Sequence, residues 1–259
     1  MKTFLLGVGA QKAGTTWLHR YLQSFDNTDL GFAKEYHIWD ALHCPECSRF
    51  QITSRLPLRP NKFRRWRMQR NPDYYFDYFQ RLLASEGIEL TGDISPSYTC
   101  LPSSVFQQIR EGCEARGMTL KILFLLRDPV QRCWSVVRMH RRKGKAKDNV
   151  AITAAEEEAV RAYYQSPNAR IRTRYDQTIE AMEAAIPREQ IFYGLYEELF
   201  TGPEIERVSR FLDLEPRFEF ADNQFNTSHP ESPLSDETAA LIAKEYREVY
   251  RYCAHRFPR

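Results

Sequence analysis

A glycine-containing loop near the N-terminus carries residue types that bind phosphate-like anions. It runs Gly9-Ala10-Gln11-Lys12-Ala13-Gly14-Thr15-Thr16 and joins a short apolar run to a helical pattern. Small residues let backbone N–H groups and the helix N-terminus surround an anion, while Lys12 adds a positive charge and the threonines add hydroxyl donors. The pattern predicts an anion-binding loop formed by Gln11, Lys12, Ala13, Gly14, Thr15, Thr16 and Trp17.

The loop differs from the P-loop of ATP-dependent kinases at one decisive position. A Walker sequence, G-x-x-x-x-G-K-[ST], has a lysine after its second glycine, and that lysine reaches the β- and γ-phosphates. The spacing from Gly9 to Gly14 fits, but Thr15 takes the lysine position. The strongest apolar run, residues 120–126, is followed by Arg127 rather than by an acidic magnesium ligand. We therefore expect phosphate binding without a metal ion. A P-loop kinase of a small metabolite is the alternative.

A second group suited to a phosphate follows the run 120–126. Arg127 stands at its end, and Ser135 lies about two helical turns further on. Arginine offers a planar fork that matches a phosphate, and serine adds one donor. We expect both side chains to bind one phosphate, such as the 3′-phosphate of a nucleotide. The competing interpretation of Arg127 is a salt bridge to Asp128 or to another neighbouring residue.

Alternating strands and helices must position these side chains. Apolar runs predict strands at residues 3–9, 87–92, 120–126 and 190–194. Helices are predicted at residues 15–24, 129–142, 151–164, 174–185, 203–212 and 235–255. This order is typical of an α/β fold, and we expect a P-loop-like domain with a central parallel sheet flanked by helices. Ligands of such sheets bind at the carboxyl ends of the strands, where both candidate groups lie.

A single domain, residues 1–259, accommodates the whole chain. We expect an irregular basic insertion around residues 43–72, because that stretch combines several prolines with many arginines and has weak periodicity. Residues 138–147 form a second basic stretch. Such runs indicate a solvated basic face, or else a site for an acidic acceptor or electrostatic steering of an anionic ligand.

Charge and composition exclude several classes of protein. The net charge of +3 and the hydrophobic content of 42% are ordinary for a globular protein. The basic runs contain no recognised nucleic-acid-binding motif, so no nucleic acid partner is expected. No apolar stretch approaches the length of about 18 residues that a transmembrane helix needs, and a cytoplasmic location is the default expectation.

Six cysteines include the pair Cys44 and Cys47, whose spacing could be half of a zinc site. A second pair of this kind is absent from the sequence, so a four-ligand site would need scattered partners. Reduced thiols or one local disulfide are the favoured interpretation, and no metal site is predicted.

Together and in this order, the two anion-binding motifs resemble those of the sulfotransferases that use 3′-phosphoadenosine 5′-phosphosulfate (PAPS). The loop from Gln11 to Leu18 resembles the 5′-phosphosulfate loop of that family, and the stretch from Arg127 to Ser135 resembles its 3′-phosphate motif. Weaker similarity at residues 196–199 and 211–214 extends the resemblance over most of the chain. It implies PAPS as the donor, adenosine 3′,5′-bisphosphate (PAP) as the product, and no metal requirement.

A third segment, Lys34-Glu35-Tyr36-His37, resembles the Lys-Glu-Pro-His segment of Golgi-type glycan sulfotransferases, including heparan sulfate enzymes. The resemblance implies that Glu35 removes the acceptor proton, that Lys34 and His37 tune or position it, and that Lys12 and Thr16 stabilise the departing phosphate. A base is needed because a hydroxyl group is a very weak acid. We expect a soluble bacterial member that acts on a glycan, a lipid, a small-molecule alcohol or an amine. The alternative is a surface Lys-Glu pair.

Two positions and one segment depart from the family pattern. Tyr36 replaces the proline, and Ile94 stands where a lysine is usual. Residues 223–229, where the family closes over the 3′-phosphate, contain no lysine or arginine, and we expect Asn226 or Ser228 to substitute. A non-catalytic nucleotide-binding module is a further alternative.

Overall fold

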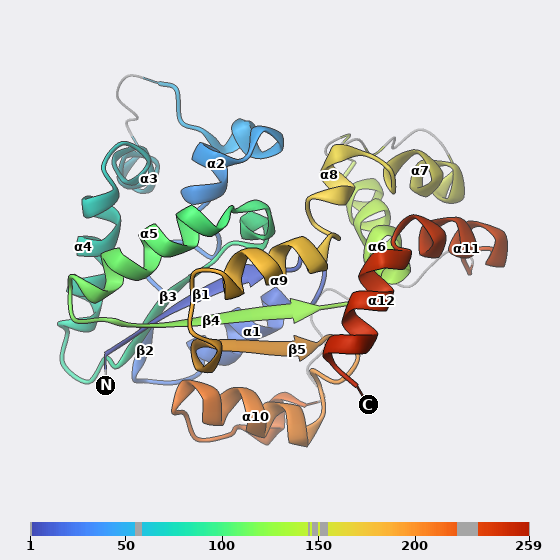
Figure 1. Cartoon of the computed structure of the whole chain (residues 1–259). Helices are drawn as coiled ribbons and strands as arrows, with labels where there is room; N and C mark the ends of the chain where they lie inside the picture. The colour runs from blue at the N-terminus through green and yellow to red at the C-terminus, as the bar shows by residue number, and fades with distance from the viewer. Residues whose placement is uncertain are drawn as a thin grey trace.

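Parallel strands form a sheet at the centre of the molecule (Figure 1). The computed structural model describes residues 2–54, 59–144, 146, 150, 155–221 and 233–258. The strands are β1 (Thr3–Gly9), β2 (Thr28–Asp29), β3 (Leu90–Ile94), β4 (Thr119–Leu126) and β5 (Ile191–Leu195). They lie in the order β2-β3-β1-β4-β5, and each neighbouring pair is parallel. The predicted α/β fold with a central parallel sheet is confirmed.

The two central strands carry the two predicted anion-binding segments. Every residue of β1 and residues 122–126 of β4 are buried, as expected for continuous apolar runs covered on both faces. The carboxyl ends of these strands are adjacent, because Gly9 pairs with Phe124 and the N–H of Ala10 donates to the carbonyl of Leu125 over 2.6 Å. The strand order reverses at β1, so the connections after β1 and β4 diverge and leave a crevice.

Helices cover the two faces of the sheet and its carboxyl edge (Figure 1). Helices α5 (Ser103–Glu114) and α9 (Tyr175–Glu183) lie on one face, and α1 (Thr15–Gln23) lies on the other. Helix α6 (Pro129–Arg142) begins just after β4. The other α-helices are α2 (Trp39–His43), α3 (Pro60–Arg70), α4 (Pro72–Leu83), α7 (Glu156–Tyr163), α8 (Pro167–Arg170), α10 (Gly202–Leu212), α11 (Asp236–Glu245) and α12 (Arg247–Arg256). The 3₁₀ helices are η1 (Pro45–Phe50), η2 (Pro96–Cys100), η3 (Arg188–Gln190) and η4 (Phe218–Phe220).

The segment between α2 and α4 is more regular than its composition indicates. The prediction of an irregular insertion around residues 43–72 is wrong for η1 and α3, which are helical. Residues 55–58 lie outside the described residues. Pro60 and Pro72 occupy the first turns of α3 and α4, where the missing N–H has no intrahelical partner to lose. These prolines therefore start helices rather than interrupt them.

Other predicted boundaries shift by small amounts. The second strand begins at Leu90 rather than at residue 87, and the helix predicted over residues 235–255 is divided at Tyr246 into α11 and α12. The predicted helix 129–142 matches α6. Among the described helices, none combines the length and apolar character needed to cross a membrane.

Candidate active site

The loop between β1 and α1 leaves the N-terminus of α1 open. Gly14, the residue before the helix, has a φ of 90°, and no side chain caps the helix. A Cβ atom on Gly14 would lie 2.3 Å from Cδ2 of Leu199, so the backbone conformation and the available space both require glycine. The N–H groups of the first turn have no intrahelical acceptor. The loop therefore offers hydrogen-bond donors at the positive end of the helix dipole.

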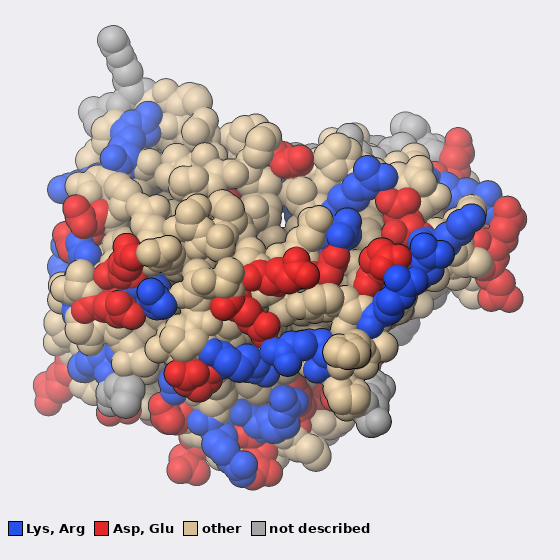
Figure 2. Space-filling view, in the orientation of Figure 1, with Lys and Arg blue, Asp and Glu red and all other residues tan. Residues whose placement is uncertain are grey.

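A pocket of about 490 Å³ opens at this end of the sheet. It collects all the predicted site residues except the fully buried Ala13, namely Gln11, Lys12, Gly14, Thr15, Thr16, Trp17, Lys34, Glu35, His37, Arg127 and Ser135. The basic residues that line it are Lys12, Lys34, Arg49, Arg127, Arg138, Arg142, Lys143 and Arg172, and Glu35 is the one acidic residue among the described lining. On the face seen in Figure 2, by contrast, basic and acidic side chains are interspersed. The pocket therefore favours an anionic ligand.

Lys12 lies among like charges. Burial and the positive charges of Arg127, Arg142, Lys143 and Arg138 lower the pKa of Lys12 to about 8. The backbone φ of Lys12 is 70°, a left-handed conformation that residues with a side chain rarely adopt and that clusters at functional sites. A bound anion would relieve the repulsion between these cations.

Arg127 connects the two segments that are predicted to bind anions. Its Nη1 donates to the carbonyl of Lys12 over 2.7 Å, and its guanidinium carbon lies 4.0 Å from the ring centre of Tyr196. Its Nε is buried without a hydrogen-bond partner among the described residues. The alternative salt bridge to Asp128 is not formed in the described structure, because the Asp128 side chain caps α6 instead. Ser135, only 4% exposed, lines the same pocket.

Two other residues of the loop differ in what they can contribute. Trp17 is 1% exposed, and its Nε1 donates to the carbonyl of Phe220 over 3.0 Å. Its indole also stacks on Tyr21 at 4.9 Å, so Trp17 mainly fixes α1 in the core. The side-chain oxygen of Gln11 is buried and accepts no hydrogen bond from the described residues, which leaves it available to a ligand.

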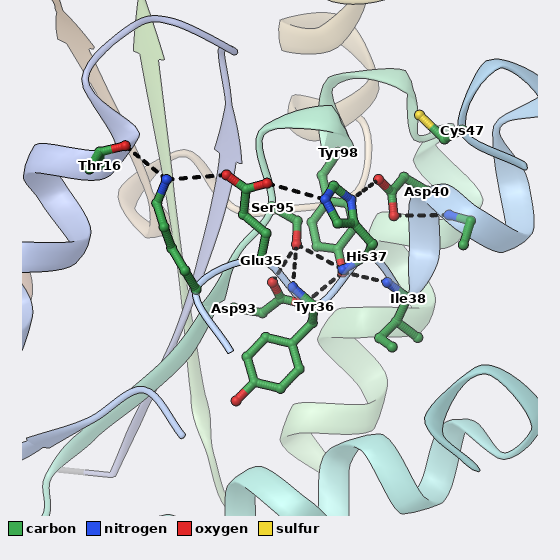
Figure 3. A network of polar contacts seen from close by, with 12 residues as sticks. Thr16, Glu35, Tyr36, His37, Ile38, Asp40, Cys47, Asp93, Ser95 and Tyr98 are labelled. Atoms are coloured by element: carbon green, nitrogen blue, oxygen red, sulfur yellow. Dashed lines mark hydrogen bonds and ion pairs between the residues drawn. The ribbon is translucent and has the colours of Figure 1, made fainter. Parts of the chain in front are cut away.

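A chain of polar contacts runs from the anion-binding loop to a buried aspartate (Figure 3). Nζ of Lys34 donates to Oγ1 of Thr16 over 2.8 Å and to Oε1 of Glu35 over 3.2 Å. The other carboxylate oxygen, Oε2 of Glu35, lies 3.2 Å from Nε2 of His37. Nδ1 of His37 lies 2.6 Å from Oδ2 of Asp40. Lys34, Glu35 and His37 thus form one connected group in the pocket rather than an isolated surface pair.

Hydrogen bonding determines the charges in this network. Burial by itself would raise the pKa of Glu35, but the hydrogen bond from His37 and the charge of Lys34 outweigh it and lower the pKa to about 2. Burial by itself would lower the pKa of His37, but its hydrogen bonds to Asp40 and Glu35 raise the pKa to about 9. At neutral pH Glu35 is therefore a carboxylate, and His37 is an imidazolium that donates from both ring nitrogens.

A serine just after β3 holds the backbone of this segment (Figure 3). Oγ of Ser95 accepts from the N–H groups of Tyr36, at 3.0 Å, and His37, at 3.1 Å, and donates to Oδ1 of Asp93 over 2.7 Å. His37 has a left-handed φ of 53°. The ring of Phe50 stacks on its imidazole with 3.6 Å between the ring centres and 6° between the planes. Packing and hydrogen bonds together therefore orient the imidazole.

Several residues of the site carry no motif in the sequence. Asp40 is one of them, and the only sequence signal for its contact with His37 is their separation of three residues. Arg49 from η1 and Arg172, between α8 and α9, also line the pocket. The expected closing segment at residues 223–229 lies outside the described residues.

The chain is an α/β protein whose pocket, at the carboxyl ends of β1 and β4, is lined mainly by basic and polar residues. A model of the sulfotransferase domain family matches residues 2–240, so the chain belongs to this family and is a transferase of the sulfotransferase type. The resemblance predicted from the motifs is thereby confirmed.

Solved structures were compared as well. A sulfotransferase from Alicyclobacillus acidocaldarius is 23% identical, with 97% of this chain and 96% of that chain covered and a TM-score of 0.60, and it shares the fold. The sulfotransferase domain of the olefin synthase from Synechococcus PCC 7002 is 13% identical, with 95% and 94% of the two chains covered and a TM-score of 0.46. A search of curated proteins found no match.

Proposed function

We propose that the protein transfers the sulfuryl group of PAPS to an acceptor hydroxyl or amine, with Glu35 as the general base. The observation that carries this proposal is the position of Lys34. Its ammonium group contacts both Thr16 in the anion-binding loop and the carboxylate of Glu35. One cation thus joins the expected position of the leaving group to the candidate base, as a group transfer with aligned reactants requires.

The pocket suits a donor with two separate anionic groups. Lys12, Thr15 and Thr16, with the open N-terminus of α1, would hold the 5′-phosphosulfate. Arg127 and Ser135 would hold the 3′-phosphate. The buried Nε of Arg127, which lacks a partner among the described residues, supports this assignment, because an unsatisfied buried donor is unfavourable and a phosphate oxygen would satisfy it.

When bound, PAPS supplies a sulfuryl group whose bond to the 5′-phosphate oxygen breaks as the acceptor atom bonds to sulfur. Lys12 and Thr16 stabilise the negative charge that develops on the departing phosphate. Glu35 takes the proton from the acceptor atom. Lys34 and His37 keep Glu35 ionised beforehand.

A pKa of about 2 makes Glu35 a weak base toward a free alcohol. The acceptor proton becomes strongly acidic as its oxygen bonds to sulfur, so its transfer to Glu35 is favourable late in the reaction. Movement of the Lys34 ammonium toward a bound anion would also remove a positive neighbour and raise the pKa of Glu35. Lys34 therefore links donor binding to the strength of the base.

The acceptor belongs to the glycans, the lipids, the small-molecule alcohols or the amines. Next to His37 the pocket is lined by Phe50 and Arg49. This combination suits an acceptor that carries a polar or acidic group beside the attacked atom.

Calorimetric titration of the purified chain with PAP and with ATP and magnesium tests the donor. We expect PAP to bind more tightly, because ATP has no 3′-phosphate for Arg127 and Ser135 to bind, and because Arg127 rather than an acidic residue directly follows β4. Tighter binding of ATP with magnesium would refute the proposal in favour of a kinase. A screen of acceptor classes with sulfur-labelled PAPS then identifies the acceptor.

A further inference from the structure

Three cysteine thiols from two separate segments meet next to the active site. Cys44 precedes η1, Cys47 lies within it, and Cys100 ends η2. Their sulfur atoms all lie within 4.8 Å of one another, and none forms a disulfide. The N–H of Cys47 donates to the carbonyl of Cys44 over 2.9 Å, so the first two thiols sit on one tight turn. A turn that carries two cysteines with this spacing is a common half of a zinc site.

A buried arginine lies against this cluster. Arg172 is 1% exposed, and its Nη2 lies 3.6 Å from Sγ of Cys47. Its Nη1 donates to the backbone and side-chain oxygens of Asn168, which are neutral. No carboxylate of the described residues forms an ion pair with Arg172. A buried positive charge needs an anionic partner, and three thiolates around a divalent cation carry net negative charge, whereas three thiols do not.

We propose that Cys44, Cys47 and Cys100 bind a thiophilic divalent metal ion, Zn²⁺ in the first place, with the carboxylate of Glu46 as the fourth ligand. Oε2 of Glu46 lies 3.4 Å from Sγ of Cys44. Zinc favours tetrahedral, sulfur-rich sites with Zn–S bonds of about 2.3 Å, which places neighbouring sulfurs roughly 3.8 Å apart. The three sulfurs lie within 4.8 Å of one another, and side-chain rotations would bring them and the Glu46 carboxylate to the spacing of such a site.

The metal would clamp the two segments that support His37. Phe50, at the end of η1, stacks on the His37 imidazole, and Ser95, just before η2, accepts from the His37 N–H. Binding of Cys47 and Cys100 to one ion fixes η1 against η2. Loss of the metal should therefore lower kcat. The affinity for PAP should stay within about twofold, because Lys12 and Arg127 follow β1 and β4 and contact none of the proposed metal ligands. The metal site itself stands independently of the donor and the base assigned above, whereas the expected fall in kcat rests on the proposed function.

Metal analysis of the full chain, purified without chelators, tests the proposal. We expect about one zinc ion per chain in the wild-type protein and less than about a tenth of that in Cys44→Ser, Cys47→Ser and Cys100→Ser. Cys253→Ser is the matched control, because this thiol is also partly buried but lies on α12, and it should keep the zinc. If a cysteine variant fails to fold, cobalt added to the reduced wild-type protein after removal of its zinc should give the intense absorption of thiolate-to-cobalt charge transfer.

Three results would overturn the proposal. The first is wild-type protein that is free of metal and gives no thiolate–cobalt absorption after reduction. The second is zinc retained by all three cysteine variants. The third is a disulfide between two of the three cysteines in protein purified without reductant, detected by mass spectrometry after alkylation.

Discussion

Nη1 of Arg127 donates to the main-chain carbonyl of Lys12 over 2.7 Å, although the two residues are 115 positions apart in sequence. The bond fastens the loop after β1 to the end of β4. It also holds the backbone of Lys12, which has a left-handed φ of 70°. The two segments proposed to bind anions are therefore one structural unit, and a change at Arg127 should affect both.

Arg127→Ala should weaken PAP binding about 100-fold, because hydrogen bonds to a charged group contribute up to about 3 kcal/mol. Calorimetry with PAP and with adenosine 5′-monophosphate measures the role of the 3′-phosphate. The wild-type protein should prefer PAP, and the variant should lose most of that preference. Arg127→Lys, which keeps the charge but not the planar fork, should be intermediate. A variant that prefers PAP as strongly as the wild-type protein would disprove the assignment of the 3′-phosphate site.

Glu35→Gln should lower kcat by about 10²- to 10⁴-fold, the usual contribution of a positioned base. PAP affinity should not fall, because the change removes a negative charge from the pocket. Steady-state kinetics together with calorimetry separate the two effects. Glu197→Gln is the matched control, since Oε1 of Glu197 accepts from the N–H of Asp128 and an amide oxygen can do the same. Unchanged kcat in Glu35→Gln would show that Glu35 is not the general base.

PAP binding above pH 8 should be accompanied by proton uptake. The pKa of Lys12 is lowered to about 8, so the free protein loses this charge as the pH rises through that value. A bound phosphate favours the ammonium form and raises the pKa again. Calorimetry near pH 8.5, in buffers with different ionisation enthalpies, counts the protons. Lys12→Arg should show much less uptake, because arginine stays charged, and equal uptake by both proteins would contradict this role of Lys12.

The pKa of His37 makes part of the stability depend on pH. Its value is raised from 6.5 to about 9 on folding. The resulting stabilisation is fully present below pH 6.5 and is lost as the pH rises through about 9, and it amounts to about 3 kcal/mol. Urea unfolding of the wild-type protein and of His37→Gln should give stabilities that differ most near pH 6 and converge near pH 10. A difference that does not change with pH would show that His37 is neutral when folded.

The parts of the fold that could be predicted from sequence have local signals. The strands β1 and β4 are continuous apolar runs, and α6 begins with Asp128 as its cap and Pro129 in its first turn. The break between α11 and α12 has no such signal. There the side chain of Tyr246 is buried and donates to the carbonyl of Tyr164 over 2.5 Å, which is a tertiary contact between distant residues.

The difference between local signals and tertiary contacts also applies to the active site. Lys34, Glu35 and His37 are neighbours in one segment, so a motif could indicate them together. Arg172 reaches the pocket, and Cys100 reaches Cys44 and Cys47, only through the packing of distant segments, and no local pattern identifies either residue. The left-handed backbone of Lys12 is likewise invisible in the sequence, because it depends on contacts such as the bond from Arg127.

Helix α1 begins without a side-chain cap, and a missing cap typically costs a helix about 1 kcal/mol. Gly14 has no side chain that could accept from the N–H groups of the first turn, so the N-terminus of α1 stays open to a ligand. A phosphate oxygen accepts from the same N–H groups that a serine or aspartate side chain would otherwise satisfy. In this role the nucleotide would be a removable cap of helix α1. Under the proposed function, departure of the nucleotide would leave these N–H groups without an acceptor, so amide hydrogen exchange at residues 15–17 should be faster in the free protein than with PAP bound.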